Sequence, residues 1–387
     1  MEVGESVCSF KGSLDVPRTE NALMEVPEGP YSPRRVVVDL RETGFIDPIA
    51  LLYLYSILVR RIALGHETEL RLPGSKAARD FLRAWKFPEA LTSATGMKFR
   101  RLVSPADHGY FGEEQTHYLE GKAASLEEFL AAKRFFGLMT RPIESSARRG
   151  RLVEREWSRW RTPLILRVLD RHLRGDGRDV ARVVIYELLT NAVQHPGAGS
   201  VTVGSSVYGS VSRGQRQDRA FAVSVWDDGV GITDTLRKAM GAGSIRAGDP
   251  TTVDRFTLKP VGWEPRGSVY ESNWTPDEAA SDAELLLASL FQGISQKAIR
   301  TDIEPIAMPG EEGRATQTGD GLHALYRTVV NDFGGSLALR SGSFFMNVKA
   351  GRKGDPTSYS VKLCRYADWP SFQGNMITAR IPIASGG

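Results

Sequence analysis

The segment 178–195 constrains the fold most, because it carries three polar side chains inside an apolar run. Glu187, Asn191 and His195 follow one another at four-residue spacing, so on an α-helix they lie close to one line along its surface. The apolar residues around them predict a second face that packs on a core. A carboxylate is costly to bury without a partner, so the polar line must face either solvent or a ligand. The helix alone leaves both alternatives open.

Length and hydropathy limit the protein classes to consider. The chain has 387 residues, of which 41% are hydrophobic, enough for roughly two to three domains with cores of their own. The longest apolar run, 49–59, is too short to cross a bilayer and is followed by two arginines. The acidic N-terminus lacks the basic segment and apolar core of a secretory signal. We therefore expect a cytoplasmic protein without a membrane span.

Cysteines and charge exclude two further classes. Cys8 and Cys364 lie far apart and have no CxxC partner, so we expect neither a disulfide framework nor a zinc site. The formal net charge of +4 is mild. Arginines gather in 148–161, but Glu154 and Glu156 interrupt them, a pattern typical of a solvated helix face. We expect no nucleic-acid partner.

Strand and helix patterns divide the chain into an N-terminal extension, a first domain, a connector and a larger domain, at 1–33, 34–105, 106–150 and 151–387. The first domain is predicted to be a small α/β unit of alternating strands and helices, at 34–40, 47–65, 68–73 and 75–91. The connector is predicted to carry one short helix, at 125–139.

The larger domain is predicted to be an α/β sandwich, with one mixed sheet covered by helices. Its helices are expected at 151–173, 178–195 and 321–332, and its strands at 200–209, 219–229, 335–342, 359–367 and 375–383. A long irregular section is expected at 233–318, with one amphipathic helix at 276–299.

A second motif follows the strand that ends at Asp227. The residues Asp-Asp-Gly-Val-Gly place Gly229 and Gly231 one residue apart, which permits positive φ and close backbone approach. A carboxylate at the end of a strand can accept a hydrogen bond from an exocyclic amine. On its own this sequence is a turn found in many proteins.

A third motif opens the helix at 321–332. Gly319 and Gly321 stand at its start, where free N–H groups and the helix dipole favour a polyphosphate. Gly334 and Gly335 end the helix and lead into the next strand. Along the chain, the first motif therefore lies within a helix, the second at the end of a strand and the third at the start of a helix.

Taken together, the three motifs resemble the GHKL ATPase superfamily, the Bergerat nucleotide-binding fold of histidine kinases, gyrase, MutL, the ninety-kilodalton heat-shock chaperone and anti-sigma-factor serine kinases. The resemblance covers roughly 150–385. It implies ATP and Mg²⁺ as cofactors, with 233–318 as the lid. By this resemblance Glu187 is the base or water-orienting residue, Asn191 the Mg²⁺ ligand and Asp227 the contact to the adenine amino group.

The resemblance also implies roles for the glycines and for three flanking residues. Gly229 and Gly231 form the turn beside the adenine, and Gly319, Gly321 and Leu322 form the phosphate loop. His195 is either a nucleotide contact or a packed imidazole at the helix end. Asn375 stands where many members carry a threonine, and it can supply a hydrogen bond in its place. Gln194 stands where histidine kinases often have a lysine.

The first domain resembles the STAS domain of anti-sigma-factor antagonists over 34–105, carried by "VVVDLRETGFIDPIALLYLYSIL" at 36–58. Asp47 matches the aspartate of that family, and Pro48 occupies the position of its phosphorylated serine. Proline has no hydroxyl and cannot accept phosphate, although it suits a helix start. Two alternatives stay open: the domain acts in cis on the lid, or it is a plain docking domain.

Two functions fit these predictions. The first is a nucleotide-dependent switch with slow ATP hydrolysis, working through a protein partner or a homodimer. The alternative is a serine protein kinase of the anti-sigma-factor type that acts on a separate protein. Histidine autophosphorylation is not expected, because His66, His108 and His117 do not lie in a dimerisation helix. A MutL-like machine would need a further downstream domain.

Overall fold

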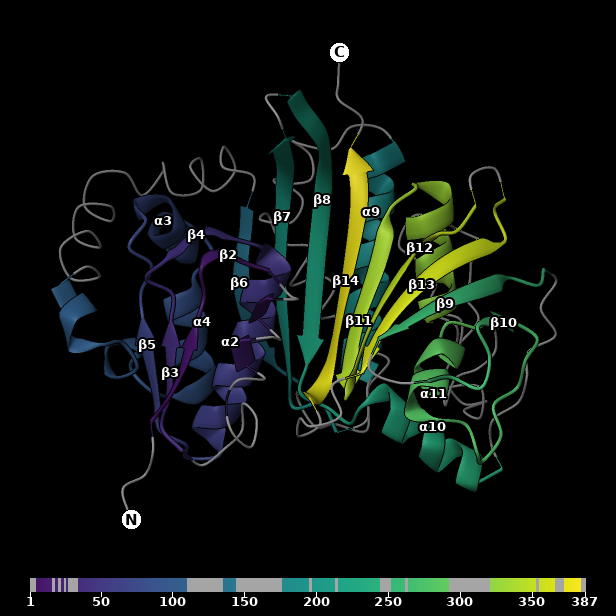
Figure 1. Ribbon diagram of the computed structural model, residues 1–387, viewed down its shortest axis with the longest axis horizontal. Coiled ribbons are helices and arrows are strands. Elements are labelled where there is room, and N and C mark those ends of the chain that lie inside the picture. Colours follow the sequence, from purple (N-terminus) through teal and green to yellow (C-terminus); the bar gives the residue numbers. More distant parts are fainter. Residues whose placement is uncertain are drawn as a thin grey trace.

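A computed structural model of the chain describes residues 5–15, 18–19, 22–23, 26, 34–109, 135–143, 176–194, 197–212, 215–243, 252–261, 264–291, 321–352, 355–365 and 372–383. Within these ranges the protein is a mixed α/β structure, as predicted (Figure 1). No helix in them combines the length and the hydropathy needed to cross a bilayer.

The described strands from residue 135 onward form one nine-stranded sheet, here called the large sheet, in the order β10-β9-β13-β12-β11-β14-β8-β7-β6. Neighbouring strands are antiparallel except for the parallel pair of β13 and β9. The strands are β6 (Phe135–Pro142), β7 (Ser200–Ser212), β8 (Gln215–Asp227), β9 (Arg255–Val261), β10 (Val269–Glu271), β11 (Ser336–Gly342), β12 (Phe344–Ala350), β13 (Ser358–Arg365) and β14 (Phe372–Ile383).

The first domain contains a parallel sheet, here called the small sheet, in the order β1-β3-β5, and a two-stranded parallel ribbon of β2 and β4. These strands are β1 (Ser6–Ser9), β2 (Gly12–Leu14), β3 (Val36–Asp39), β4 (Thr43–Ile46) and β5 (Thr68–Arg71). The segment expected as an extension, 1–33, thus contributes β1 and β2 to this domain.

The first domain also holds α2 (Pro48–Ala63), α3 (Lys76–Ala84), α4 (Phe87–Thr95) and two 3₁₀ turns, η1 (Phe99–Arg101) and η2 (Pro105–Asp107). The larger domain holds α9 (Asp176–Gln194), α10 (Ile232–Gly241), α11 (Asp282–Ala288) and α12 (Gly321–Tyr326), which continues into a π-helical segment, η4 (Arg327–Asp332).

Helix α2 is buried on every side. All residues from Pro48 to Leu58 are buried, and Asp47 caps its start by accepting hydrogen bonds from the backbone N–H groups of Ile49 and Ala50. A helix that is apolar in all directions belongs in an interior. In Figure 1, α2 lies between the small sheet and the large sheet. Its predicted start and length are confirmed, and both its faces are covered.

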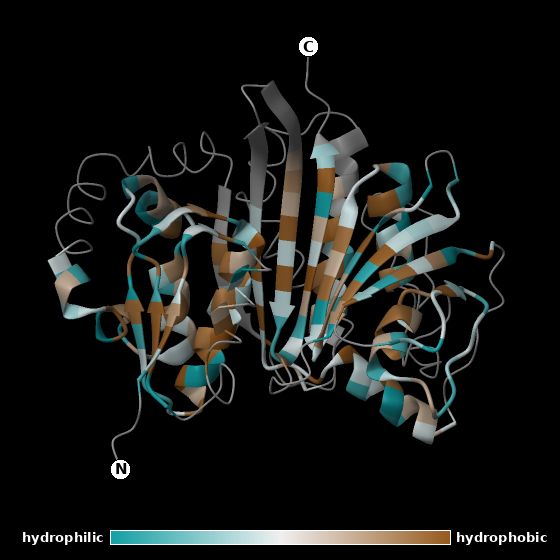
Figure 2. Ribbon diagram, viewed as in Figure 1, coloured by the Kyte–Doolittle hydropathy of each residue, from teal (hydrophilic) through white to brown (hydrophobic). Residues whose placement is uncertain are grey.

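The large sheet is covered by different elements on its two faces. In β14, Ile377 and Ala379 belong to the core that includes α9, whereas Phe372 and Met376 belong to the core that includes α2. Successive strand residues point to opposite faces, so α9 and α2 must cover opposite faces. Figure 2 shows apolar and polar residues following one another along β14.

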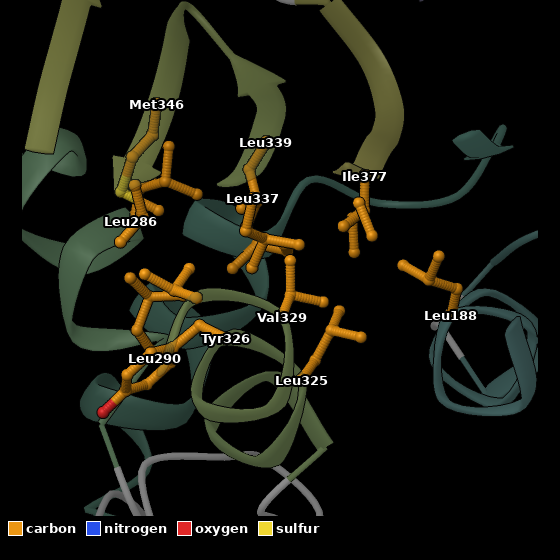
Figure 3. Packing of buried hydrophobic residues seen from close by; sticks show 14 of the residues in the cluster. Leu188, Leu286, Leu290, Leu325, Tyr326, Val329, Leu337, Leu339, Met346 and Ile377 are labelled. Atoms are coloured by element: carbon orange, nitrogen blue, oxygen red, sulfur yellow. The ribbon is translucent and has the colours of Figure 1, made fainter. Parts of the chain in front are cut away.

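The core on the α9 face joins three helices to the sheet. Leu188 of α9, Leu325 of α12 and Leu286 of α11 point toward Leu337 and Ile377 of the strands (Figure 3). All five belong to the same cluster, and each is at most 6% exposed. Burying an aliphatic side chain of this size contributes about 1.5–3 kcal/mol, so this cluster fixes α9 and α12 to the sheet.

The single helix predicted at 75–91 is wrong. The chain forms α3 and α4 instead, with a break at Lys86, whose φ is 52°. That left-handed conformation interrupts a helix, and Pro88 then stands in the first turn of α4, where its missing N–H is tolerated.

The connector helix predicted at 125–139 is wrong for its last residues. Phe135–Pro142 is the strand β6, which pairs with the outer side of β7. Tertiary context overrides the local helical pattern here. Without β6, the outer side of β7 would carry a row of unpaired backbone donors and acceptors. Residues 125–134 lie outside the described residues.

About half of the described residues in 233–318, the section expected to be irregular, lie in helices and strands. This section holds most of α10, the strands β9 and β10, and α11, so this prediction is wrong. The amphipathic helix expected at 276–299 is the shorter α11, which is buried along its length and starts with a capping box between Ser281 and Glu284. Strand β12 was not predicted. The helix expected at 151–173 lies outside the described residues.

Candidate functional site

Four strands of the large sheet meet at one edge, where the Asp-Asp-Gly-Val-Gly motif lies. Asp227, the last residue of β8, pairs with Val201 at the start of β7 and with Asn375 near the start of β14. Asn375 in turn pairs with Ser341 near the end of β11. We call the group Asp227, Ser341 and Asn375 the Asp227 edge; the ends of these strands converge in Figure 1.

The end of helix α9 lies at the same edge. Helix α9 ends at Gln194, and β7 begins at Ser200, beside the end of β8. Asp228 fastens this connection by accepting hydrogen bonds from the backbone N–H groups of Gly199 and Ser200, at 2.7 and 2.8 Å. Asn191 stands in the last turn of α9 and is half-buried, so it lies near this edge.

The Asp227 side chain is buried, with 3% of its surface exposed. Its Oδ1 atom accepts a hydrogen bond from the backbone N–H of Gly229 at 3.0 Å, and the Asn375 amide donates to its two oxygens at 3.3 and 3.5 Å. Burial raises the pKa of Asp227 to about 8, although both hydrogen bonds act to lower it. The carboxyl group is therefore held in one orientation at the strand end.

Asn375 holds the turn that follows Asp227. Its Oδ1 atom accepts hydrogen bonds from the backbone N–H of Ile232 at 2.9 Å and from the hydroxyl of Ser341 at 2.7 Å. Its Nδ2 atom donates to the carbonyl oxygen of Val230 at 3.1 Å as well as to Asp227. A primary amide has two donors and two acceptor sites, so these contacts engage all of them inside the protein. We therefore assign Asn375 to positioning the turn.

The two glycines of the motif connect β8 to α10. Gly229 and Gly231 are both buried, and Gly231 directly precedes the first residue of α10. The backbone N–H of Ile232 donates to the Ser341 hydroxyl at 2.9 Å and to Asn375, which satisfies a donor that the start of a helix leaves open. The motif is thus a strand-to-helix turn; the sequence predicts its strand but not the helix that follows.

Glu187 is buried, with 5% of its surface exposed, so the solvent-facing alternative for the polar line is wrong for this residue. Asn191, one turn later, is half-buried. A carboxylate and an amide oxygen four residues apart are hard donors of the kind that Mg²⁺ uses together with phosphate and water oxygens, so their chemistry fits the implied ion. His195, the third residue of the line, lies outside the described residues.

The start of α12 points toward the same edge. After η4 a short turn leads into β11, which runs from Ser336 back to Ser341 at the Asp227 edge. Helical residues 321–332 and residues 336–341 of β11 each span about 17 Å, so Gly321 lies toward the Asp227 edge. Leu322 is half-buried and packs on the core. Gly319 lies outside the described residues.

Two side chains at this edge were not singled out from the sequence as site residues. Asp228 fastens the start of β7, and its position next to Asp227 is the signal that could have found it. Ser341 bonds both Asn375 and Ile232, but nothing in the surrounding sequence distinguishes it from any polar residue near a strand end.

Comparison of the chain with protein-family models, with curated proteins and with solved structures gave no match.

Proposed function

We propose that the chain binds Mg·ATP at the Asp227 edge through a GHKL-type fold and acts as a nucleotide-dependent switch that hydrolyses ATP slowly. One observation carries this proposal. A buried carboxyl group at a strand end is held by Gly229 and Asn375, beside the end of the helix that carries Glu187 and Asn191. A fixed acceptor of this kind suits an exocyclic amino group better than a flexible surface carboxylate does.

Each residue of the proposed site has a separate task. Asp227 accepts a hydrogen bond from the adenine amino group, and the turn of Gly229 and Gly231 lets the backbone approach the base. The Asn191 amide oxygen holds Mg²⁺, which offsets the charge of the phosphates when bound. Glu187 accepts a proton from the attacking water or orients it.

The phosphates are proposed to lie at the start of α12. The backbone N–H groups of Gly319, Gly321 and Leu322 would contact them, because a helix start offers unpaired donors to an anion. Mg·ATP bound between α9 and α12 would favour one arrangement of the segments that flank it, and a protein partner or a second copy would sense that arrangement.

The first domain is proposed to be STAS-like and to serve as a docking domain. The start of α2, where Pro48 replaces the phosphorylated serine of such domains, faces the large sheet, and Asp47 accepts a hydrogen bond from Arg380 of β14 at 3.1 Å. Pro48 is buried, and it offers no hydroxyl group. Both features favour docking over phosphate acceptance at this point.

Calorimetric titration of ATP with Mg²⁺ tests the proposal with three variants. Asp227→Ala should abolish binding, whereas Glu187→Gln should bind ATP and fail to hydrolyse it. Glu278→Ala removes an exposed carboxylate from a distant turn and should behave as the parent protein does. Tight ATP binding by Asp227→Ala would refute the site. A phosphoprotein formed from labelled ATP and a separate substrate protein would replace the switch by the serine kinase.

A further inference from the structure

Each strand that supplies a residue to the Asp227 edge also buries a neighbouring residue against the first domain. Trp226, Arg340 and Met376 adjoin Asp227, Ser341 and Asn375 in sequence, and none is more than 2% exposed. Because strand side chains alternate, these neighbours point to the face that α2 covers. On each of the three strands, the residue that packs on the α2 side is therefore the sequence neighbour of a residue of the Asp227 edge.

Arg340 makes the most direct of these links. Its guanidinium carbon lies 5.8 Å from the ring centre of Tyr53 in α2 and 5.4 Å from that of Phe372, and the side chain is 1% exposed. Its Nη1 atom donates to the carbonyl oxygens of Gly342 and Phe344, at 2.6 and 3.0 Å. A buried guanidinium is costly unless ring faces and hydrogen bonds replace water, and here the two rings and the two hydrogen bonds of Nη1 replace part of it.

The residue next to Arg340 carries the link into the site. Ser341 lies between Arg340 and Gly342, whose carbonyl group Arg340 binds. The Ser341 hydroxyl donates to Asn375 at 2.7 Å and accepts from the N–H of Ile232 at 2.9 Å. Fixing the backbone on both sides of Ser341 therefore fixes the hydroxyl that holds the turn.

A second contact acts on β8, which is separated from β11 by β14. The Trp226 ring lies edge-on to Tyr55 of α2, with ring centres 5.9 Å apart, and its Nε1 atom donates to the carbonyl oxygen of Gln373 at 3.1 Å. The Gln373 side chain donates to the carbonyl oxygen of Asp228 at 3.2 Å. The end of β8 and the start of β14 are thus tied together under α2.

We propose that Arg340 is a positioning residue through which α2 of the first domain sets the geometry of the turn at 227–231. The turn then has its binding conformation only when the first domain is packed on the large sheet. Only the identity of the ligand rests on the proposed function; the coupling itself is a property of the fold.

Hydrogen exchange measured by mass spectrometry tests the coupling without any nucleotide. Peptides that cover residues 228–233 report the amides of Gly229 and Ile232, which are bonded to Asp227 and to the Ser341–Asn375 pair. Arg340→Met should raise their exchange roughly tenfold, because the turn opens locally more often. Val361→Ala truncates a buried side chain of β13 in the core on the α9 face, so it is the control for general loss of stability and should leave this peptide close to the parent rate.

Tyr53→Leu provides a second variant in case Arg340→Met fails to fold. It removes one ring face from the guanidinium while keeping the arginine in place, and it should raise exchange in the same peptide. Unchanged exchange in both variants, or an equal increase in Val361→Ala, would overturn the coupling.

ATP titration of the same variants separates this inference from the proposed function. If the parent protein binds ATP, Arg340→Met should weaken the affinity roughly tenfold at unchanged stoichiometry. If the parent protein does not bind ATP, the proposed function fails, and the exchange rates alone still decide whether α2 sets the turn.

Discussion

A β-carbon added to Gly374 would lie 1.7 Å from the carbonyl oxygen of Asp227. Gly374 also has a φ of 78°, a conformation that side chains other than hydrogen rarely adopt. It directly precedes Asn375, so its missing side chain lets β14 approach the end of β8 closely enough for the amide to reach the carboxyl group. Close approach of these two strands is therefore a condition for the Asp227 edge.

Gly374→Ala should destabilise the protein severely and disrupt the edge. Gly65→Ala is a matched control, because Gly65 has a φ of 74° but no atom within 4 Å of an added β-carbon. We expect the control to cost about 1 kcal/mol of unfolding free energy from backbone strain alone, and Gly374→Ala to cost more than about 3 kcal/mol. Urea unfolding of both variants measures these free energies. Equal losses of unfolding free energy in the two variants would show that the steric clash with Asp227 does not destabilise the protein.

Stability should fall with rising pH because of Asp227. Burial raises its pKa from 3.8 to about 8, so the folded protein binds this proton more tightly than the unfolded chain does. The contribution is fully present below about pH 4 and is lost progressively up to about pH 8. Asp227→Asn mimics the protonated group, so the parent protein should lose unfolding free energy relative to this variant across that window. A difference that stays constant between pH 4 and 9 would contradict the assignment.

Asp47 should contribute to stability in two separable ways. Its carboxylate caps α2 through Ile49 and Ala50 and also accepts a hydrogen bond from Arg380. Asp47→Asn keeps the cap and removes the charge. Burial raises the pKa of Asp47 despite the nearby Arg380, and Arg380 is partly exposed, so this variant should change the free energy of unfolding by less than about 1 kcal/mol.

Asp47→Ala loses the cap as well and should cost about 1 kcal/mol more than Asp47→Asn. Ser75→Ala removes only a helix cap, that of α3, and calibrates this difference. Denaturant unfolding provides the values, and equal costs for the two Asp47 variants would mean that the cap contributes nothing.

Gly204 should be required by the packing of the first domain on β7. A β-carbon there would lie 2.7 Å from Cζ3 of Trp85 and 3.1 Å from Cδ2 of Leu138. Gly204→Ala should cost about 1–3 kcal/mol through overpacking, and Trp85→Phe should recover part of that loss in the double variant. A double-mutant cycle on the unfolding free energy measures the coupling; strictly additive losses would exclude this contact as the cause.

Local patterns were sufficient to predict most of the elements that carry the site. Helix α9, the end of β8 at Asp227 and helix 321–332 all lie where the sequence places them, because periodicity and glycine positions mark their ends. The turn of Gly229 and Gly231 lies at the end of the strand as predicted, but the helix α10 that follows it was expected to be irregular. The ligands assigned to these residues stay predictions.

Elements that depend on distant partners were missed or misassigned. Phe135–Pro142 has a helical pattern but forms β6, because β7 offers it backbone hydrogen bonds that no local window contains. The same holds for Ser341, whose role exists only because β11 and β14 bring it beside Asn375. Lys86 was missed for another reason, since a left-handed lysine leaves no compositional signal.

The burial of α2 between the two sheets gives the two domains one shared interior. Removing residues 1–105 would expose Trp226 and Met376 to water. The remaining chain would then carry an apolar patch on that face of the large sheet. Heat should therefore unfold the chain in a single calorimetric peak instead of two, with the first domain and the large sheet melting as one cooperative unit.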